Sequence, residues 1–275
     1  MTDTLCPVCQ KSDRVKVLSL TLQGGTDFGV WRCGRCRHIW RTEPWKVSNQ
    51  ITYYEASPPT AKVMEALSNK TVKVFEKFLQ LADKLKSNPT RLMVDFGCSC
   101  GTAMLMFKKH GWDVLGIELL PSAQKVLDER NLPWASSMKD SGLALRSVDI
   151  VVMSDCIYYL ADPVGTLREI RSYMRPNGML FLRHPTRAGL FYVSLKIMRK
   201  KVQSFPWGSH VHLFSRKSAE LTLKQAGFAN MKFLKEEGYE RPLRTKIIHQ
   251  LMRAADFISL GLLGLTLSWT VIAKE

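Results

Sequence analysis

The chain has 275 residues, of which 45% are hydrophobic; this suffices for one full α/β domain with a small appendage and excludes a wholly disordered protein. Its formal net charge is +16, and residues 168–250 alone carry 17 lysines and arginines against 5 acidic residues. Such an excess could attract nucleic acid, anionic lipid or a phosphorylated substrate, or form a solvated basic surface, because net charge alone does not select a partner.

Two Cys-x-x-Cys pairs stand near the N-terminus: Cys6 with Cys9, and Cys33 with Cys36. Tetrahedral Zn²⁺ needs four ligands, and each pair supplies two thiolates from one tight turn. We predict that residues 1–42 form a zinc ribbon, in which His38 is a spare ligand that a four-thiolate site does not need. Such a closed site is structural and stabilises a segment too short to bury a core of its own.

The cysteines also indicate the compartment. The chain has seven, with four in tight pairs, which is typical of metal chemistry in a reducing compartment and not of a disulfide framework. We expect no secretory signal, because Cys6 follows a short polar stretch, and we predict a cytoplasmic protein. Residues 257–273 are largely apolar, but Gly261 and Gly264 interrupt them, so we expect a helix end, a turn and a strand at 265–273 instead of a membrane span.

Regular structure beyond the ribbon is predicted from residue 61 onward. Residues 43–60 are a connector, because Pro44, Pro58 and Pro59 prevent regular structure there. Apolar residues then recur at helical spacing until residues 87–89 end a first helix. Strands are predicted at residues 15–22, 29–32, 92–96, 114–117, near 134, 148–153, 179–182, 231–234 and 265–273. Further helices are predicted at residues 102–110, 122–130, 163–174, 215–226 and around 244–258. A turn is predicted at residues 175–178. The alternation after residue 90 requires βαβ crossovers and a mainly parallel sheet.

The most informative stretch is the turn after the predicted strand at 92–96. Asp95 stands at the end of this strand, and Gly97 and Gly101 let the backbone pass close to a ligand, just before a helix start with free N–H groups. Glu118 ends the next strand about 20 residues further on, where a carboxylate can accept hydrogen bonds from both hydroxyls of a ribose. The sequence therefore predicts a site for a nucleoside cofactor.

The glycine spacing narrows the choice of cofactor. Asp-x-Gly-x-x-x-Gly differs from the Gly-x-Gly-x-x-Gly that fits the pyrophosphate of a dinucleotide. It resembles motif I of class I S-adenosylmethionine (SAM)-dependent methyltransferases, with Ser99 where members often have a further glycine. Three later segments are similar to successive parts of that family, the last of them common in small-molecule and glycan methyltransferases: residues 147–163, residues 167–182, and residues 210–215 with 226–228. The resemblance covers residues 60–275, with the motifs in order.

The resemblance implies a Rossmann-like SAM-dependent methyltransferase domain over residues 61–275, with a mostly parallel sheet of seven strands, an antiparallel last strand and flanking helices. It also implies SAM as cofactor and assigns its contacts: Gly97, Cys98, Ser99 and Gly101 to the methionine part, Glu118 to the ribose, Leu119 to the adenine face, Ser137 and Met138 to the adenine edge, and Asp155 and Cys156 to the surroundings of the methyl group. Asp95 is expected to brace the turn or to bind through water. Similar ribbons precede the SAM domain in many bacterial members, often followed by a tyrosine pair such as Tyr53 and Tyr54.

Two histidines are candidates for a general base, which helps methyl transfer when the nucleophile is oxygen or carbon. His210 comes first, because it lies in the late segment that resembles the family and a histidine titrates near neutrality. His184 comes second, because it follows the fifth strand, where open α/β sheets bind ligands. A structural role is the alternative for both. His212 could point away from His210 in an extended segment, and Tyr158 and Tyr159 could line the substrate pocket or pack in the core.

Three functions are compatible with these features. The first is methyl transfer from SAM to a small-molecule or glycan-precursor acceptor. The second is RNA methylation, in which the ribbon and the basic and aromatic residues at 196–201 and 205–207 would hold phosphates and bases, with binding that weakens steeply with salt. The third is a binding module whose SAM fold has lost activity. Nothing in the sequence names the acceptor or indicates an oligomeric state.

Overall fold

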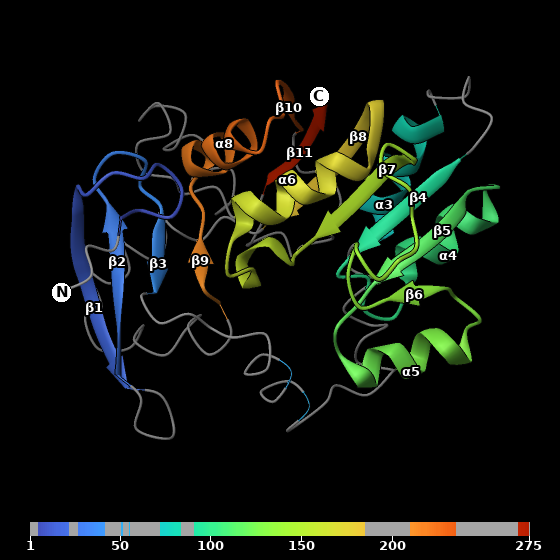
Figure 1. Cartoon of the computed structure of the whole chain (residues 1–275), viewed down its shortest axis with the longest axis horizontal. Coiled ribbons are helices and arrows are strands. Elements are labelled where there is room, and N and C mark those ends of the chain that lie inside the picture. The colour runs from blue at the N-terminus through green and yellow to red at the C-terminus, as the bar shows by residue number, and fades with distance from the viewer. Residues whose placement is uncertain are drawn as a thin grey trace, which may run out of the picture.

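The computed structural model describes residues 5–21, 27–41, 51, 55, 72–83, 91–184, 210–234 and 269–274. Two sheets make up this part of the chain: a seven-stranded sheet and a four-stranded sheet that lies beside it (Figure 1). No helix in these ranges is long and apolar enough to cross a membrane. Most of the predicted connector at 43–60, with Tyr53 and Tyr54, and the predicted helix around 244–258 lie outside the described residues.

The seven-stranded sheet has the strand order β10-β11-β8-β7-β4-β5-β6. Its strands are β4 (Leu92–Phe96), β5 (Asp113–Ile117), β6 (Trp134–Ala135), β7 (Val148–Ser154), β8 (Met174–His184), β10 (Asn230–Leu234) and β11 (Trp269–Lys274). The five strands from β6 to β8 run parallel, whereas β11 is antiparallel to both of its neighbours. The predicted mostly parallel sheet with an antiparallel last strand is therefore confirmed, and the carboxyl ends of its parallel strands meet at one edge.

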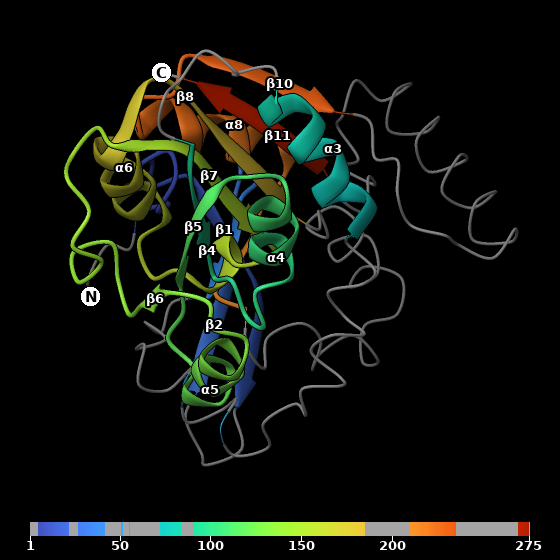
Figure 2. The same ribbon diagram turned by 90° about the vertical axis from the view of Figure 1, so that its right-hand side faces the viewer.

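Helices cover both faces of this sheet (Figure 2). They are α3 (Val72–Ala82), α4 (Thr102–Lys109), α5 (Pro121–Glu129), α6 (Pro163–Tyr173) and α8 (Arg216–Gln225), with the short 3-10 helix η2 (Ile157–Tyr159) after β7. Because side chains alternate along a strand, Phe181 of β8 stacks on Phe78 of α3, with ring centres 4.7 Å apart. Leu180 and Leu182 point the other way, into the core shared with α6 and α8. The sheet is therefore buried on both faces.

Local capping explains why two of the helices begin where the sequence predicts. Pro163 occupies the first turn of α6, and the side chain of Asp162 accepts a hydrogen bond of 2.9 Å from the backbone N–H of Gly165. At the start of α8, Ser215 and Ser218 exchange side-chain-to-backbone hydrogen bonds of 2.9 and 3.1 Å. Both arrangements satisfy N–H groups that a helix start leaves without an intrahelical partner.

The predicted turn at residues 175–178 is wrong, because β8 continues through it. Met174 pairs with Val148 and Met179 with Ile150, so β8 advances five residues where β7 advances two. Asn177 takes a left-handed φ of 67° within this bulge, a conformation that asparagine tolerates better than most residues. Turn-forming residues therefore serve here to bulge a strand and not to end one.

The four-stranded sheet joins the N-terminal segment to residues 212–213. β1 (Arg14–Thr21), β2 (Asp27–Cys33) and β3 (Ile39–Arg41) form an antiparallel sheet in the region predicted to be a ribbon. Its fourth strand, β9 (His212–Leu213), comes from the segment before α8 and pairs antiparallel with β3. This pairing was not predicted, and it fixes the N-terminal sheet against the rest of the chain (Figure 1).

Candidate functional site

The turn between β4 and α4 is built so that only glycine fits at two of its positions. Gly97 and Gly101 have φ values of 77° and 74°, which L-residues rarely adopt. A Cβ on Gly97 would lie 2.9 Å from the Cβ of Cys156, and a Cβ on Gly101 would lie 2.5 Å from Cδ1 of Leu132. Cys156 and Leu132 therefore pack closely against the turn at these two positions. The lack of side chains on the two glycines would let a ligand come close to the backbone.

Ser99 adopts the conformation of the glycine that it replaces. Its φ is 50°, in the left-handed region, which costs a residue with a Cβ about 1–2 kcal/mol. Its backbone N–H donates a hydrogen bond of 2.8 Å to Oε2 of Glu118. This bond therefore holds Ser99 in its left-handed conformation.

Glu118 lies at the carboxyl end of β5 and faces the turn. Its side chain is only 7% exposed, and its Oε1 accepts two further backbone bonds, from Leu119 at 2.8 Å and Leu120 at 2.9 Å. Burial raises the pKa of Glu118, the three N–H donors lower it, and the carboxylate of Glu55 raises it. The three donors fix the orientation of the carboxylate and leave acceptor capacity on Oε2.

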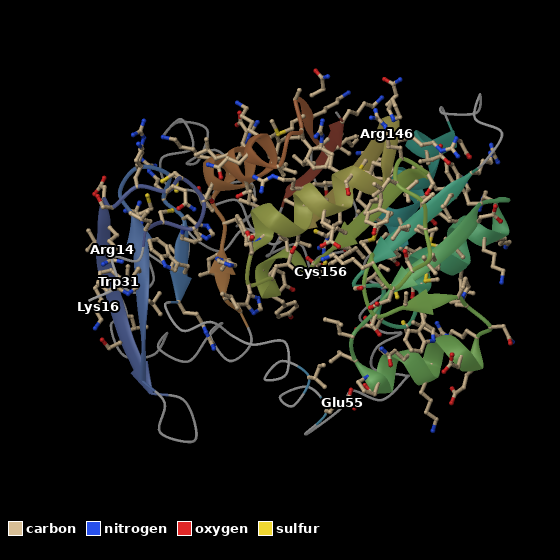
Figure 3. The ribbon with its side chains drawn as sticks, in the orientation of Figure 1. Arg14, Lys16, Trp31, Glu55, Arg146 and Cys156 are labelled. Atoms are coloured by element: carbon tan, nitrogen blue, oxygen red, sulfur yellow. The ribbon has the colours of Figure 1, made fainter. Side chains whose placement is uncertain are left out.

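Asp95 and two cysteines gather around the same turn. Burial, followed by the charge of Glu118, raises the pKa of buried Asp95 to about 7. Burial and then the charges of Asp95 and Glu118 hold the pKa values of Cys98 and Cys156 well above the usual range. The Cys156 thiol donates to the carbonyl of Phe96 at 3.1 Å (Figure 3). The turn is therefore surrounded by two buried carboxyl groups with raised pKa values and by two thiols that stay neutral.

The other predicted cofactor residues differ in what they offer. Leu119, which follows Glu118, is 39% exposed and offers an apolar surface. Ser137 is bonded to Asp140, with 2.6 Å between Oγ and Oδ2. The side chain of Met138 lies in the hydrophobic core, and its carbonyl accepts a bond of 2.5 Å from Ser141 Oγ.

Asp155 lies at the end of β7, where the sequence places it, but it faces β8. Its carboxylate forms an ion pair with Arg183, and its backbone N–H donates to the Arg183 carbonyl at 3.0 Å. Asp155 also has a left-handed φ of 58°. The Arg183 guanidinium therefore offsets its charge, and this partner could not be read from the sequence.

Glu55 is a residue that sequence reasoning missed. Its carboxylate accepts hydrogen bonds from the backbone N–H and the hydroxyl of Ser122, at 3.2 and 2.7 Å, at the start of α5 (Figure 3). Leu120, the residue that precedes this helix, has no side chain able to cap it, so Glu55 supplies the cap. No local signal connects two residues this far apart in sequence.

His210 and His184, the two candidate bases, contact the same tyrosine. The imidazole of half-buried His210 stacks on Tyr158, with ring centres 4.0 Å apart and an interplanar angle of 11°. His184 meets Tyr158 edge-on at 5.4 Å and is buried. Tyr159 also lies edge-on to His210, at 5.4 Å. The structure therefore brings both histidines to the carboxyl ends of β7 and β8, with His210 the more accessible.

His212 faces in a different direction from His210. Its Nδ1 lies 3.0 Å from Nε2 of His38, and both rings are buried. Burial lowers the pKa of His212 to about 4, and burial together with the charges of His212 and His184 holds the pKa of His38 well below its usual value. At neutral pH one neutral imidazole therefore donates to the other, and neither is poised to act as a base.

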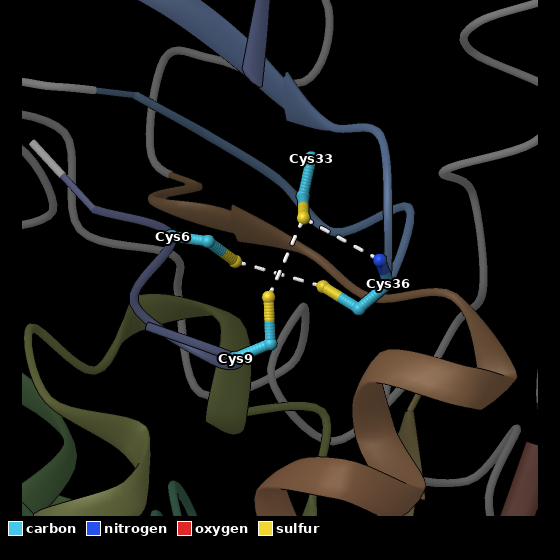
Figure 4. Close-up of side chains that lie close together, drawn as sticks. All are labelled: Cys6, Cys9, Cys33 and Cys36. Atoms are coloured by element: carbon cyan, nitrogen blue, oxygen red, sulfur yellow. Dashed lines mark hydrogen bonds between the residues drawn. The ribbon is translucent and has the colours of Figure 1, made fainter. Parts of the chain in front are cut away.

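The four paired cysteines converge, as the spacing predicts. All four Sγ atoms lie within 4.8 Å of one another, with 3.5 Å between Cys6 and Cys36 and 3.5 Å between Cys9 and Cys33 (Figure 4). Sulfur atoms around tetrahedral Zn²⁺ stand about 3.8 Å apart. The hydrogen bond with the Cys36 thiol lowers the pKa of Cys6 to about 6 and raises that of Cys36. The cluster thus fits Zn²⁺, and His38 is not among the ligand groups found in the described ranges.

Comparison with known proteins relates this geometry to one family. The family model described as a methyltransferase domain matches residues 67–232. A SAM-dependent methyltransferase from Thermotoga maritima superposes with a TM-score of 0.53 at 15% identity, over 82% of this chain and 99% of that one. A chain of the complex between the Haloferax volcanii Trm112 methyltransferase activator and a methyltransferase superposes with a TM-score of 0.51 at 16% sequence identity, over 82% of this chain and 96% of that one. The plantazolicin methyltransferase BpumL in complex with S-adenosylhomocysteine (SAH) gives 0.50 at 16%, over 82% and 95%. No curated protein matches the chain.

Proposed function

Because this chain belongs to the class I SAM-dependent methyltransferases, we propose that it methylates a small-molecule or glycan-precursor acceptor bound at the carboxyl ends of β7 and β8. The observation that carries this proposal is the stack of His210 on Tyr158, with ring centres 4.0 Å apart, next to the end of β7. A half-buried imidazole held against a buried ring can meet a ligand and accept a proton from it. Of the candidate bases, only His210 combines these two properties.

The turn and Glu118 would hold SAM. The backbone at Gly97, Ser99 and Gly101 offers a close approach for the methionine part, because side chains at the two glycines would collide with the layer beneath. The free acceptor position on Oε2 of Glu118 suits a ribose hydroxyl. Leu119 would pack on the adenine. The carboxylate of Glu118, which three backbone N–H groups hold in place, would favour a cationic cofactor over its neutral product.

The reaction divides between the cofactor and the chain. Bound SAM supplies an electrophilic methyl group on a positively charged sulfur. His210 accepts the proton of an acceptor hydroxyl or carbon acid, while Tyr158 holds the imidazole plane in place. The neighbouring thiols of Cys98 and Cys156 do not compete as nucleophiles, since their raised pKa values keep them protonated.

The four-cysteine cluster would hold one structural Zn²⁺. Its thiols would lose their protons on binding the dication, because the thiolate is the form of cysteine that ligates a metal. Four protein ligands leave no open position, so this metal has no part in methyl transfer.

Calorimetry with SAH tests the cofactor site. We expect Glu118→Gln to weaken SAH binding at least about tenfold, because a hydrogen bond to a charged group is worth about 1.5–3 kcal/mol. The matched control is Glu129→Gln, which changes an exposed carboxylate on α5 and should leave SAH affinity unaltered. Equal affinity of the two variants would remove Glu118 from the site.

Transfer of labelled methyl groups to a panel of hydroxyl-bearing small molecules and nucleotide sugars tests the acceptor class. With an active acceptor, His210→Ala should lower kcat about 10²–10⁴-fold while SAH affinity is unchanged. Transfer to RNA with none to the panel would overturn the acceptor proposal in favour of RNA methylation. The segments on which that alternative rests, residues 196–201 and 205–207, lie outside the described residues.

A further inference from the structure

The residue that follows His210 is hydrogen-bonded on one side to the 3-10 helix η2 and on the other to strand β3. The backbone N–H of Val211 donates to the carbonyl of Tyr158 at 2.9 Å, and the carbonyl of Val211 accepts from the backbone N–H of Arg41 at 3.1 Å. Tyr158 belongs to η2, beside the candidate base, and Arg41 is the last residue of β3 in the four-stranded sheet. The position of His210 therefore depends on a backbone connection to the N-terminal sheet.

The same connection extends to the cysteine cluster. Ser215 Oγ donates to the carbonyl of Cys36 at 3.0 Å, and Lys217 Nζ donates to the carbonyl of Arg35 at 3.0 Å. The start of α8 is thus bonded directly to one of the two cysteine turns. From residue 211 to residue 217 the segment after His210 contacts residues 35–41 along its length.

His38 is at the centre of this junction. It lies two residues after Cys36, its ring is buried, and its Nε2 is 3.0 Å from Nδ1 of His212. Its ring also contacts Phe214 at 4.7 Å, and Phe214 meets His184 edge-on at 5.1 Å. The rings of His38, Phe214 and His184 therefore form a continuous series of contacts from the cysteine turn to the histidine beside Tyr158.

We propose that His38 is a positioning residue for methyl transfer, which holds the β9 segment, and with it His210, in register against Tyr158 through its bond to His212. β9 is only two residues long, so the buried side-chain bond of His212 adds to the hydrogen bonds of Val211 and Ser215 that hold this segment. We expect SAM binding not to depend on this bond, because the glycine turn and Glu118 follow β4 and β5 and are not part of the β3–β9 junction. The catalytic part of this inference rests on the proposed role of His210.

The test compares His38→Phe, which keeps a ring of similar size but loses the hydrogen bond, with His38→Asn, which keeps a donor and an acceptor. The control is His110→Phe, at a histidine exposed at the end of α4. We expect His38→Phe to lower kcat at least about tenfold, because small displacements of a catalytic group cost this much or more, with SAH affinity and zinc content unchanged. His38→Asn should recover part of the lost kcat, and His110→Phe should match the wild type.

A double-mutant cycle and amide hydrogen exchange complete the test. If His38 and His212 act through one bond, adding His212→Phe to His38→Phe should lower kcat no further. Exchange at the amide of Val211 should rise in His38→Phe, whether or not an acceptor has been found. Unchanged exchange and kcat would overturn the proposal, as would a parallel loss of kcat and SAH affinity. Failure of His210→Ala to affect turnover, with faster Val211 exchange in His38→Phe, would instead overturn only the proposed role of His210.

Discussion

The backbone N–H of Ser99 is bonded to the carboxylate of Glu118 across the candidate cofactor site, with 2.8 Å between N and Oε2. This bond joins the turn after β4 to the end of β5, so the two elements proposed to hold SAM are directly connected. It also holds Ser99 at a φ of 50°. The geometry of the turn therefore depends on residue 99 tolerating a left-handed backbone.

Substitutions at Ser99 should separate backbone shape from side-chain chemistry. Ser99→Gly should keep SAH affinity within about threefold, because glycine adopts this conformation freely. Ser99→Val should lower the affinity at least about tenfold, since a β-branched residue resists positive φ. Calorimetry on both variants measures the difference. A loss of affinity in Ser99→Gly as large as in Ser99→Val would show that the hydroxyl, and not the backbone, matters.

Two glycines with nearly the same backbone conformation allow two effects of a Gly→Ala substitution on stability to be separated: the strain of a positive φ and the steric clash of the added Cβ. Gly101 and Gly142 have φ values of 74° and 70°, but a Cβ on Gly101 would meet Leu132 at 2.5 Å, whereas one on Gly142 meets nothing within 4 Å. We expect Gly142→Ala to cost about 1–2 kcal/mol of unfolding free energy and Gly101→Ala about 1–3 kcal/mol more. Urea denaturation measures both, and equal costs would contradict the packing under the turn.

The raised pKa of Asp95 should make stability depend on pH. The folded protein keeps this proton up to about pH 7, whereas the unfolded chain loses it near 3.8. Because the folded state then binds more protons, the free energy of unfolding should fall as pH rises through this window. Asp95→Asn removes that fall, so the unfolding free energy of the variant should rise relative to that of the wild type toward pH 8. The relative increase should be a few kcal/mol at most, since one pKa unit is worth about 1.4 kcal/mol.

Urea denaturation across this pH range measures the effect of Asp95→Asn. Asp113→Asn is the control, because Asp113 is an exposed carboxylate at the start of β5. The change of interest is the pH dependence of Asp95→Asn relative to this control. A difference from the wild type that is constant with pH for Asp95→Asn would show that the buried carboxyl titrates normally.

Removal of the metal should loosen the small sheet. Protein purified with zinc should contain about one Zn²⁺ per chain, and dialysis against a chelator should lower its melting temperature by several degrees, because the ribbon has little core of its own. Cys33→Ser should lose the metal, whereas Cys100→Ser, at a cysteine of the turn after β4, should retain it. Metal analysis and differential scanning calorimetry give the two readouts. Full zinc content in Cys33→Ser would rule out the four-thiolate site.

The features that the sequence determined by itself are local ones. Strand and helix periodicity identified the elements of the large sheet, and the four helices predicted within the described residues end within one residue of their predicted bounds. The two Cys-x-x-Cys pairs predicted the convergence of Cys6, Cys9, Cys33 and Cys36, whereas the cofactor site indicated by the spacing of Gly97, Gly101 and Glu118 stays a prediction. Each signal lies within a few residues or follows from the order of strands in a parallel sheet.

Only the tertiary structure decided what joins distant segments. The pairing of β3 with β9, the His38–His212 contact across 174 residues, the ion pair of Asp155 with Arg183 and the cap that Glu55 places on α5 leave no periodic trace in the chain. The bulge at residues 175–178 was likewise unforeseen, because turn residues look the same whether they end a strand or bend it. Local spacing sets which backbone conformations are favourable, whereas the partner of a buried polar group is chosen by how the layers pack.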